Sequence, residues 1–158
     1  MLHPFEPVWD QHSRILILGS FPSVASREIG FYYGHPRNRF WQMLSAVYGE
    51  TVPQETEGKV RFLLAHQLAL WDALASCEVA GSADADIRSA VPNNLLPILS
   101  GAPVRRVIAN GQLAGRAVQS MRLELPDVQT LVMPSTSPAN AAWSLERLCA
   151  VWKEALLA

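Results

Sequence analysis

Residues 14–19 read RILILG and are followed by Ser20. This apolar run has the length of a strand that is buried on both faces, and the Gly-Ser pair that closes it is typical of a turn. Strands buried on both faces belong to parallel sheets, because helices cover the two faces of such sheets. The stretch therefore predicts an inner strand of an α/β sheet, with a loop at its carboxyl end.

Strand and helix patterns alternate on the carboxyl side of this run. Further buried strands are predicted at residues 68–71, 104–110 and 128–133. The helical spacing of apolar residues predicts helices over residues 38–48, 57–66, 93–99, 112–122 and 140–157. Strands that alternate with helices build a mostly parallel sheet with both faces covered, so the expected class is α/β with four strands.

Composition indicates one globular domain over residues 1–158, with no metal and no disulfide. Cys77 and Cys149 lack CxxC spacing and a histidine-rich neighbourhood, so a zinc site is not expected. The first residues lack a signal-peptide pattern, and no stretch approaches the ~18 apolar residues of a membrane span. We expect a cytoplasmic protein without a membrane partner. The net charge of −1 does not favour indiscriminate polyanion binding, so any nucleic-acid site must be local.

Ligands of open α/β sheets bind at the carboxyl ends of the strands. That rule selects the segments after Gly19, Trp71, Asn110 and Met133. The first of them, residues 20–37, is longer than most connections in a compact domain, and its aromatic content favours a functional loop.

Two of these segments carry motifs. The first is GSFPSVAS at 19–26, followed by GFYYGHPRNRFW at 30–41, and the second is MPSTSPAN at 133–140. The first motif resembles GINPG and the GFPFAxPxNRFW-like stretch of mismatch-specific uracil glycosylases, with which it shares Pro22, Gly30, Phe31, Pro36, Asn38, Arg39, Phe40 and Trp41. The second resembles the HPS or NPS motif of the uracil-DNA glycosylase superfamily. The resemblance covers nearly the whole chain and implies the three-layer α/β/α sandwich of that superfamily.

Two departures point to one branch of the superfamily. Phe21 stands where most members have a catalytic Asn or Asp, and Met133 replaces the usual His or Asn of the second motif. This combination is similar to the hypoxanthine-DNA glycosylase branch, in which the Asn of the PRNRFW segment is regarded as the important polar residue. The resemblance therefore implies Asn38 as the catalytic residue. Asn38 could also be the N-cap of its helix, and the two roles are compatible; Asn140 is favoured as the cap of the last helix.

Hydrolysis of an N-glycosidic bond passes through a sugar cation, so it needs a held water and hydrogen-bond donors for the departing base, but no metal or other cofactor. The base must first leave the duplex and enter a pocket with aromatic walls. The residues expected in this pocket are Gly19, Ser20, Phe21, Ser23, Tyr33, Phe40 and Asn110, with Asn110 reading a base edge. The loop at 135–139 resembles the loop that presses into DNA in similar enzymes, and this resemblance implies contacts with phosphates. The residues expected to contact DNA are Ser26, Arg37, Pro134, Ser135, Thr136 and Ser137, with Arg39 as a further candidate.

The leading hypothesis is a monomeric, monofunctional glycosylase of base excision repair that removes hypoxanthine from DNA, with uracil and xanthine as further candidate bases. The chain's two lysines, Lys59 and Lys153, lie outside the motifs, so Schiff-base lyase chemistry is not expected. Two alternatives stay open: an inactive module that binds damaged DNA, and a hydrolase of free nucleosides. The interpretation requires Tyr33, Asn38 and the 134–139 turn to face one another.

Overall fold

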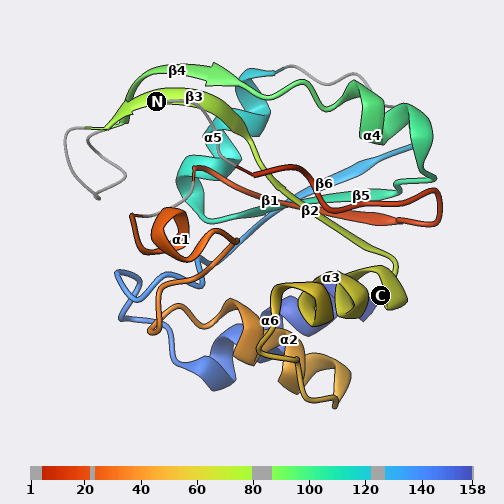
Figure 1. Cartoon of the computed structure of the whole chain (residues 1–158), viewed down its shortest axis with the longest axis vertical. Helices are drawn as coiled ribbons and strands as arrows, with labels where there is room; N and C mark the ends of the chain where they lie inside the picture. The colour runs from red at the N-terminus through yellow and green to blue at the C-terminus, as the bar shows by residue number, and fades with distance from the viewer. Residues whose placement is uncertain (1–4, 22–23, 80–86, 122–126, 158) are drawn as a thin grey trace.

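The computed structural model describes residues 5–21, 24–79, 87–121 and 127–157 (Figure 1). Its central sheet has four parallel strands in the order β2-β1-β5-β6, which are Leu68–Asp72, Ile15–Gly19, Arg106–Asn110 and Gln129–Met133. β1 pairs with both β2 and β5, so the RILILG run forms an inner strand as predicted. Its Leu16, Ile17 and Leu18 are fully buried.

Two layers cover the sheet, which confirms the predicted α/β/α sandwich. One layer holds α2 (Phe40–Tyr48), α3 (Thr56–Ala65) and α6 (Leu145–Leu157) (Figure 1). The other holds α4 (Leu96–Gly101), α5 (Gln112–Ser120) and an antiparallel pair of strands, β3 (Leu74–Val79) and β4 (Ile87–Pro92) (Figure 1). Within the described residues, no helix is both long enough and apolar enough to cross a membrane.

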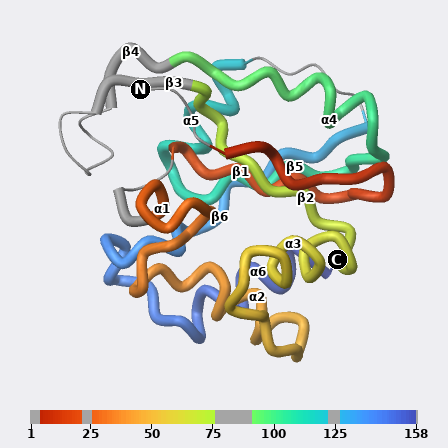
Figure 2. Tube along the Cα trace, in the orientation of Figure 1, coloured from red at the N-terminus to blue at the C-terminus, as the bar shows by residue number. Residues whose placement is uncertain are grey.

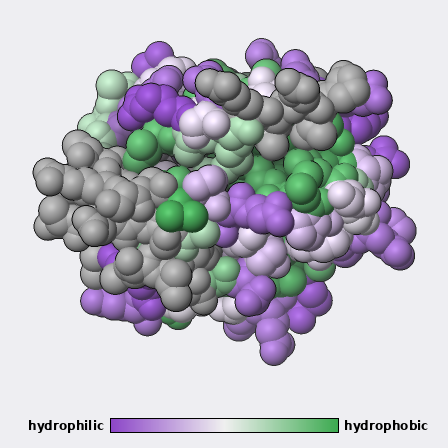
Figure 3. Space-filling model, turned by 90° about the horizontal axis from the view of Figure 1, so that it is seen from above, coloured by the Kyte–Doolittle hydropathy of each residue, from purple (hydrophilic) through white to green (hydrophobic). Residues whose placement is uncertain are grey.

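Successive side chains of β1 point to opposite faces of the sheet, so the interior forms two cores. Ile17 packs with the cluster under α2 and α6, whereas Leu16 and Leu18 pack with the cluster under α4 and α5. The outer side of the second layer shows apolar groups near its centre, with hydrophilic groups mainly around the edge (Figure 3). Two large apolar side chains of that layer are exposed, Val91 and Leu96, which is ordinary for a protein surface.

Three sequence-based expectations need correction. The predicted loop at 20–37 contains a short helix, α1 (Val24–Ile29), whose six residues are too few to show a clear helical period. The β3-β4 pair was not predicted, because register shifts interrupt its alternation. The last helix begins at Leu145 rather than at residue 140, so Asn140 is not its cap; its side chain donates instead to the carbonyl of Ser135 (3.0 Å).

The chain runs through the sheet so that the segments after β1, β5 and β6 emerge at one rim (Figure 2). Gly19 lies level with Asp72 of β2, and Asn110 lies level with Met133 of β6. This register brings together the loop before α2, the start of α5 and the loop that leads to α6.

Candidate active site

A continuous chain of hydrogen bonds joins four side chains at this rim. The Thr136 hydroxyl donates to Oδ1 of Asn38 (2.9 Å) and accepts from Nδ2 of Asn110 (3.0 Å). Nδ2 of Asn110 also donates to the Tyr33 hydroxyl (3.1 Å), and Oδ1 of Asn110 accepts the backbone N–H of Thr136 (3.1 Å). Tyr33, Asn38 and the loop after β6 therefore face one another, which is the arrangement that the sequence interpretation required.

Asn38 occupies a fixed position at the start of α2. Its Oδ1 accepts the Thr136 hydroxyl and also the backbone N–H of Phe40 (3.0 Å), so it satisfies the first free N–H of the helix, although Arg39 holds the cap position. An amide oxygen has two lone pairs, and both are engaged here. The two hydrogens of Nδ2 remain, and no acceptor among the described residues pairs with them.

Tyr33 is held in an unusual backbone conformation. Its φ of 52° lies in the left-handed region, which non-glycine residues rarely adopt. Its ring stacks on Phe40, with centroids 4.1 Å apart and an interplanar angle of 23°, and its hydroxyl is held by Asn110. Backbone strain of this kind persists only where the surroundings impose it, and it is concentrated at functional sites.

Gly19 allows a buried carboxylate to approach Tyr33. A Cβ at residue 19 would overlap Oδ1 of Asp72 and lie 3.0 Å from the Tyr33 hydroxyl. Burial, and next the negative charge of Asp72, raise the pKa of Tyr33, so its hydroxyl stays neutral. Gly19 thus contributes to the site by lacking a side chain, which leaves room for the Asp72 carboxylate beside Tyr33.

The three tyrosines of the chain all have a raised pKa in the fold, and this predicts an alkaline response. Burial is the largest cause for Tyr32, Tyr33 and Tyr48, and it raises the pKa of Tyr48 to about 12. The unfolded tyrosines ionise near 10.0, so the free energy of unfolding should fall as the pH rises above that value. In a spectrophotometric titration, tyrosinate absorbance should appear together with unfolding. A tyrosinate midpoint near 10.0 in folded protein would contradict this account.

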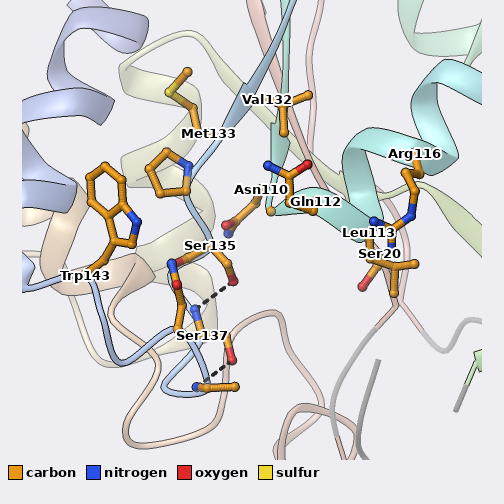
Figure 4. Close-up of a pocket in the computed structure, with 14 residues that line it drawn as sticks. Ser20, Asn110, Gln112, Leu113, Arg116, Val132, Met133, Ser135, Ser137 and Trp143 are labelled. Carbon is orange, nitrogen blue, oxygen red and sulfur yellow. Dashed lines mark hydrogen bonds between the residues drawn. The ribbon is translucent and has the colours of Figure 1, made fainter. Parts of the chain in front are cut away.

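A cavity of about 620 Å³ lies between the start of α5 and the loop after β6 (Figure 4). Trp143 lies on the loop side of this cavity, Arg116 lies on the α5 side, and Asn110 lies between them (Figure 4). The cavity is lined by Ser20, Asn110, Gly111, Gln112, Leu113, Arg116, Val132, Met133, Pro134, Ser135, Ser137, Ala139, Asn140 and Trp143. Among the described residues, no group of three or more His, Cys, Asp or Glu side chains could hold a metal.

Five of the residues proposed from sequence line this cavity: Ser20, Asn110, Pro134, Ser135 and Ser137. The hydroxyls of Ser135 and Ser137 accept the backbone N–H groups of Ser137 and Ala139, which shapes the loop into successive tight turns (Figure 4). Arg37 is exposed, and its backbone N–H donates to Nδ1 of His35. Phe21 is partly buried, while Ser23 and Pro22 lie outside the described residues.

Other proposed residues lie inside the molecule. The hydroxyl of Ser26 accepts the backbone N–H of Gly34 (2.9 Å), and the residue is 3% exposed, so it does not fit the expected contact with DNA. Thr136 is fully buried in the network, so the same correction applies to it. Phe40 is also fully buried, and its ring stacks on one face of Tyr33, so it does not face a ligand. Asn110 has both amide hydrogens engaged, so in this conformation it has none for a base edge.

Arg39 has a role that the sequence interpretation did not foresee. Its guanidinium donates to the backbone carbonyls of Ser137 (2.9 Å), Asn140 (3.2 Å) and Trp143, and its backbone N–H donates to the carbonyl of Thr136 (3.1 Å). Backbone carbonyls are common to all residues, so no sequence pattern marks them as partners of a distant arginine.

Comparison with known proteins adds independent information on this site. The family model described as the Uracil DNA glycosylase superfamily matches residues 7–156. The chain belongs to the uracil DNA glycosylase superfamily. The resemblance seen in the sequence motifs is thereby confirmed, and the hydrogen-bonded rim is a feature of a uracil DNA glycosylase superfamily member.

Two curated relatives of this superfamily member carry the name Hypoxanthine DNA glycosylase. The one from Methanosarcina barkeri is 31% identical over 153 residues, which cover 96% of this chain and 95% of the relative. The one from Methanosarcina acetivorans is 34% identical over 145 residues, which cover 90% of each chain. A solution NMR structure described as a candidate uracil DNA glycosylase from Methanosarcina acetivorans matches with a TM-score of 0.84 and 31% identity, and the match covers 99% of this chain and 97% of that one.

Proposed function

We propose that this superfamily member is a DNA glycosylase that hydrolyses the bond between hypoxanthine and its sugar in DNA and leaves an abasic site. The family match and the names of both curated relatives support this choice of reaction and base. The observation that carries the proposal is the position of Asn38, whose oxygen is bound on the protein side while its amide hydrogens remain for a substrate. With Phe21 and Met133 at the usual catalytic positions, Asn38 supplies the missing polar group.

The hydrogen bonds of Asn38 favour one chemical role over another. Because both lone pairs of Oδ1 are engaged, this oxygen has no free site at which to accept a proton from an attacking water. The Nδ2 hydrogens can donate to an acceptor atom of the base. A departing base gains negative charge in the transition state, so a fixed donor binds that state more strongly than the ground state and accelerates the reaction.

The aromatic residues of the rim are consistent with a base that has left the duplex. Phe40 covers one face of the Tyr33 ring, so a base that stacks on Tyr33 has to use the opposite face. The Tyr33 hydroxyl remains neutral because of its raised pKa, which suits contact with an uncharged base. The serine-rich turns at 135–137 are proposed to contact the DNA backbone beside the cavity.

The test is a cleavage panel with single- and double-stranded oligonucleotides that contain inosine, uracil or xanthine. We expect inosine-containing strands to acquire abasic sites, which alkali converts into breaks. Without alkali the strands should stay intact, because the two lysines, Lys59 and Lys153, lie outside the motif segments and no lysine is available there for a Schiff base.

Other outcomes of this panel would reject the proposal. Intact inosine strands that nevertheless bind the protein would indicate a damage-binding module. Cleavage of free inosine that undamaged DNA does not inhibit would indicate a nucleoside hydrolase. Strand breaks without alkali would show lyase activity and would overturn the monofunctional assignment.

A further inference from the structure

We propose that Arg39 is a positioning residue, which holds the loop at residues 136–143 in the shape that DNA binding requires. This proposal rests on the proposed function, because that function assigns the loop to DNA. The guanidinium of Arg39 donates to backbone carbonyls of the loop, so the loop and not the base is its partner. Its role is exerted through the loop that it binds.

The geometry shows one residue binding the loop at several points. The backbone N–H of Arg39 binds the carbonyl of Thr136, where the loop begins, and its guanidinium binds the carbonyls of Ser137, Asn140 and Trp143 further along. These carbonyls are spread along the loop from its first residue, Thr136, to its last, Trp143. The contacts of Arg39 therefore determine the path of the whole loop.

Arg39 follows Asn38 directly, and this adjacency links the loop to the reacting groups. The side chain of Asn38 binds the Thr136 hydroxyl, while the backbone N–H of Arg39 binds the Thr136 carbonyl. The start of α2 thus holds the amide and the loop in a single arrangement. The distance between a base bound by Asn38 and the turns proposed to contact the DNA backbone would therefore be constant.

The partners of Arg39 leave its charge unneutralised. The acceptors that its guanidinium binds are neutral carbonyls, and in the described ranges no carboxylate forms an ion pair with it. Its Nε is buried without a hydrogen-bond partner there. A positive charge directly under the loop would attract phosphates, so charge and positioning have to be separated by experiment.

Arginine and lysine differ in a way that allows this separation. A guanidinium presents five donors in a planar fork, whereas a lysine ammonium is a compact charge with three donors. Arg39→Lys keeps the charge but presents one nitrogen in place of the two guanidinium nitrogens that bind the carbonyls of Ser137 and Trp143. Arg39→Gln removes both the charge and the fork.

The experiment compares Arg39→Lys and Arg39→Gln with the wild type and with Arg61→Gln. Arg61 is exposed on α3, so its substitution makes the same change of charge away from the rim. The dissociation constant for an inosine duplex and the single-turnover rate at saturating protein are measured separately. We expect both Arg39 variants to bind DNA roughly tenfold or more weakly, because small displacements of binding groups have large effects. The saturating rate should stay within about threefold of wild type, since Asn38 is unchanged.

Hydrogen exchange provides a second measurement that needs neither DNA nor catalysis. Backbone amides at residues 139–143 should exchange faster in Arg39→Lys than in the wild type, whereas those of β1 and β5 should not change. This result would separate a loosened loop from a general loss of folding.

Specific results would overturn the proposal. Arg39→Lys with wild-type affinity and exchange would show that charge alone matters. A saturating rate that falls as far as that of an Asn38 variant would make Arg39 catalytic instead. If the wild type left inosine uncleaved, the proposed function would fail, while affinity and exchange would still decide the role of Arg39 in the loop.

Discussion

Asn38→Ala is expected to lower the single-turnover rate of hypoxanthine excision by roughly 10²- to 10³-fold, the usual effect of removing a hydrogen-bond donor that acts in the transition state. Affinity for DNA should remain, because the proposed function assigns Asn38 to the base and assigns the contact with the DNA backbone to the loop after β6. The same substitution removes the acceptor for the N–H of Phe40, so it should also destabilise the fold by about 1 kcal/mol.

Asn38→Asp is the matched control for that result. A carboxylate can still accept the Phe40 N–H and the Thr136 hydroxyl, so the free energy of unfolding should stay close to that of the wild type. It has no N–H to offer, so excision should be as slow as in the alanine variant. Rapid hypoxanthine excision by the aspartate variant would show that the oxygen is the working atom, and it would refute the donor role.

Thr136→Val is expected to have the second-largest effect, although valine has nearly the same shape. Thr136 is fully buried, and its hydroxyl joins Asn38 to Asn110. Valine leaves an Nδ2 hydrogen of Asn110 and Oδ1 of Asn38 without their hydroxyl partner in the interior. This loss should lower the free energy of unfolding by about 1–3 kcal/mol. Because the amide of Asn38 loses one of its two constraints, excision should also slow by about tenfold or more.

Thr136→Ser tests whether the hydroxyl is responsible. Serine keeps the hydrogen bonds and loses a methyl group, so excision should return to nearly the wild-type rate even if some stability is lost. Urea unfolding and single-turnover kinetics measure the two effects separately. Equal rates for the valine variant and the wild type would mean that the network is not required for catalysis.

The architecture could be predicted because burial leaves a clear pattern in the sequence. The strand at 15–19 appears as an unbroken apolar run, and α2 ends where a glycine, Gly49, adopts a φ of 66° that is favourable for this residue type. The β3-β4 pair could not be predicted, since its register shifts remove the alternation that marks a strand. Asn140 was misassigned because a cap residue resembles any other asparagine in a turn, and here its side chain binds Ser135.

The location of the site could be predicted from the sequence, but the hydrogen bonds within it could not. Parallel strands place their carboxyl ends at one rim, so the meeting of Tyr33, Asn38 and the loop after β6 followed from the order of elements. The burial of Thr136 and the contacts of Arg39 could not be foreseen, because they join residues that are about a hundred positions apart in the chain. For the same reason, Asn110 was assigned to a base edge although its hydrogens are bound within the protein.

The contact between the start of α2 and the loop that leads into α6 has a mechanical consequence. Phe40 of α2 packs edge-on against Trp152 of α6, and the indole N–H of Trp152 donates to the carbonyl of Pro134 (3.0 Å). Trp152 thus links α2, α6 and the loop after β6. A substitution that tilts this pair of helices against the sheet should displace Asn38 and the loop together, so the distance between them should change less than the distance from either of them to Asn110 of β5.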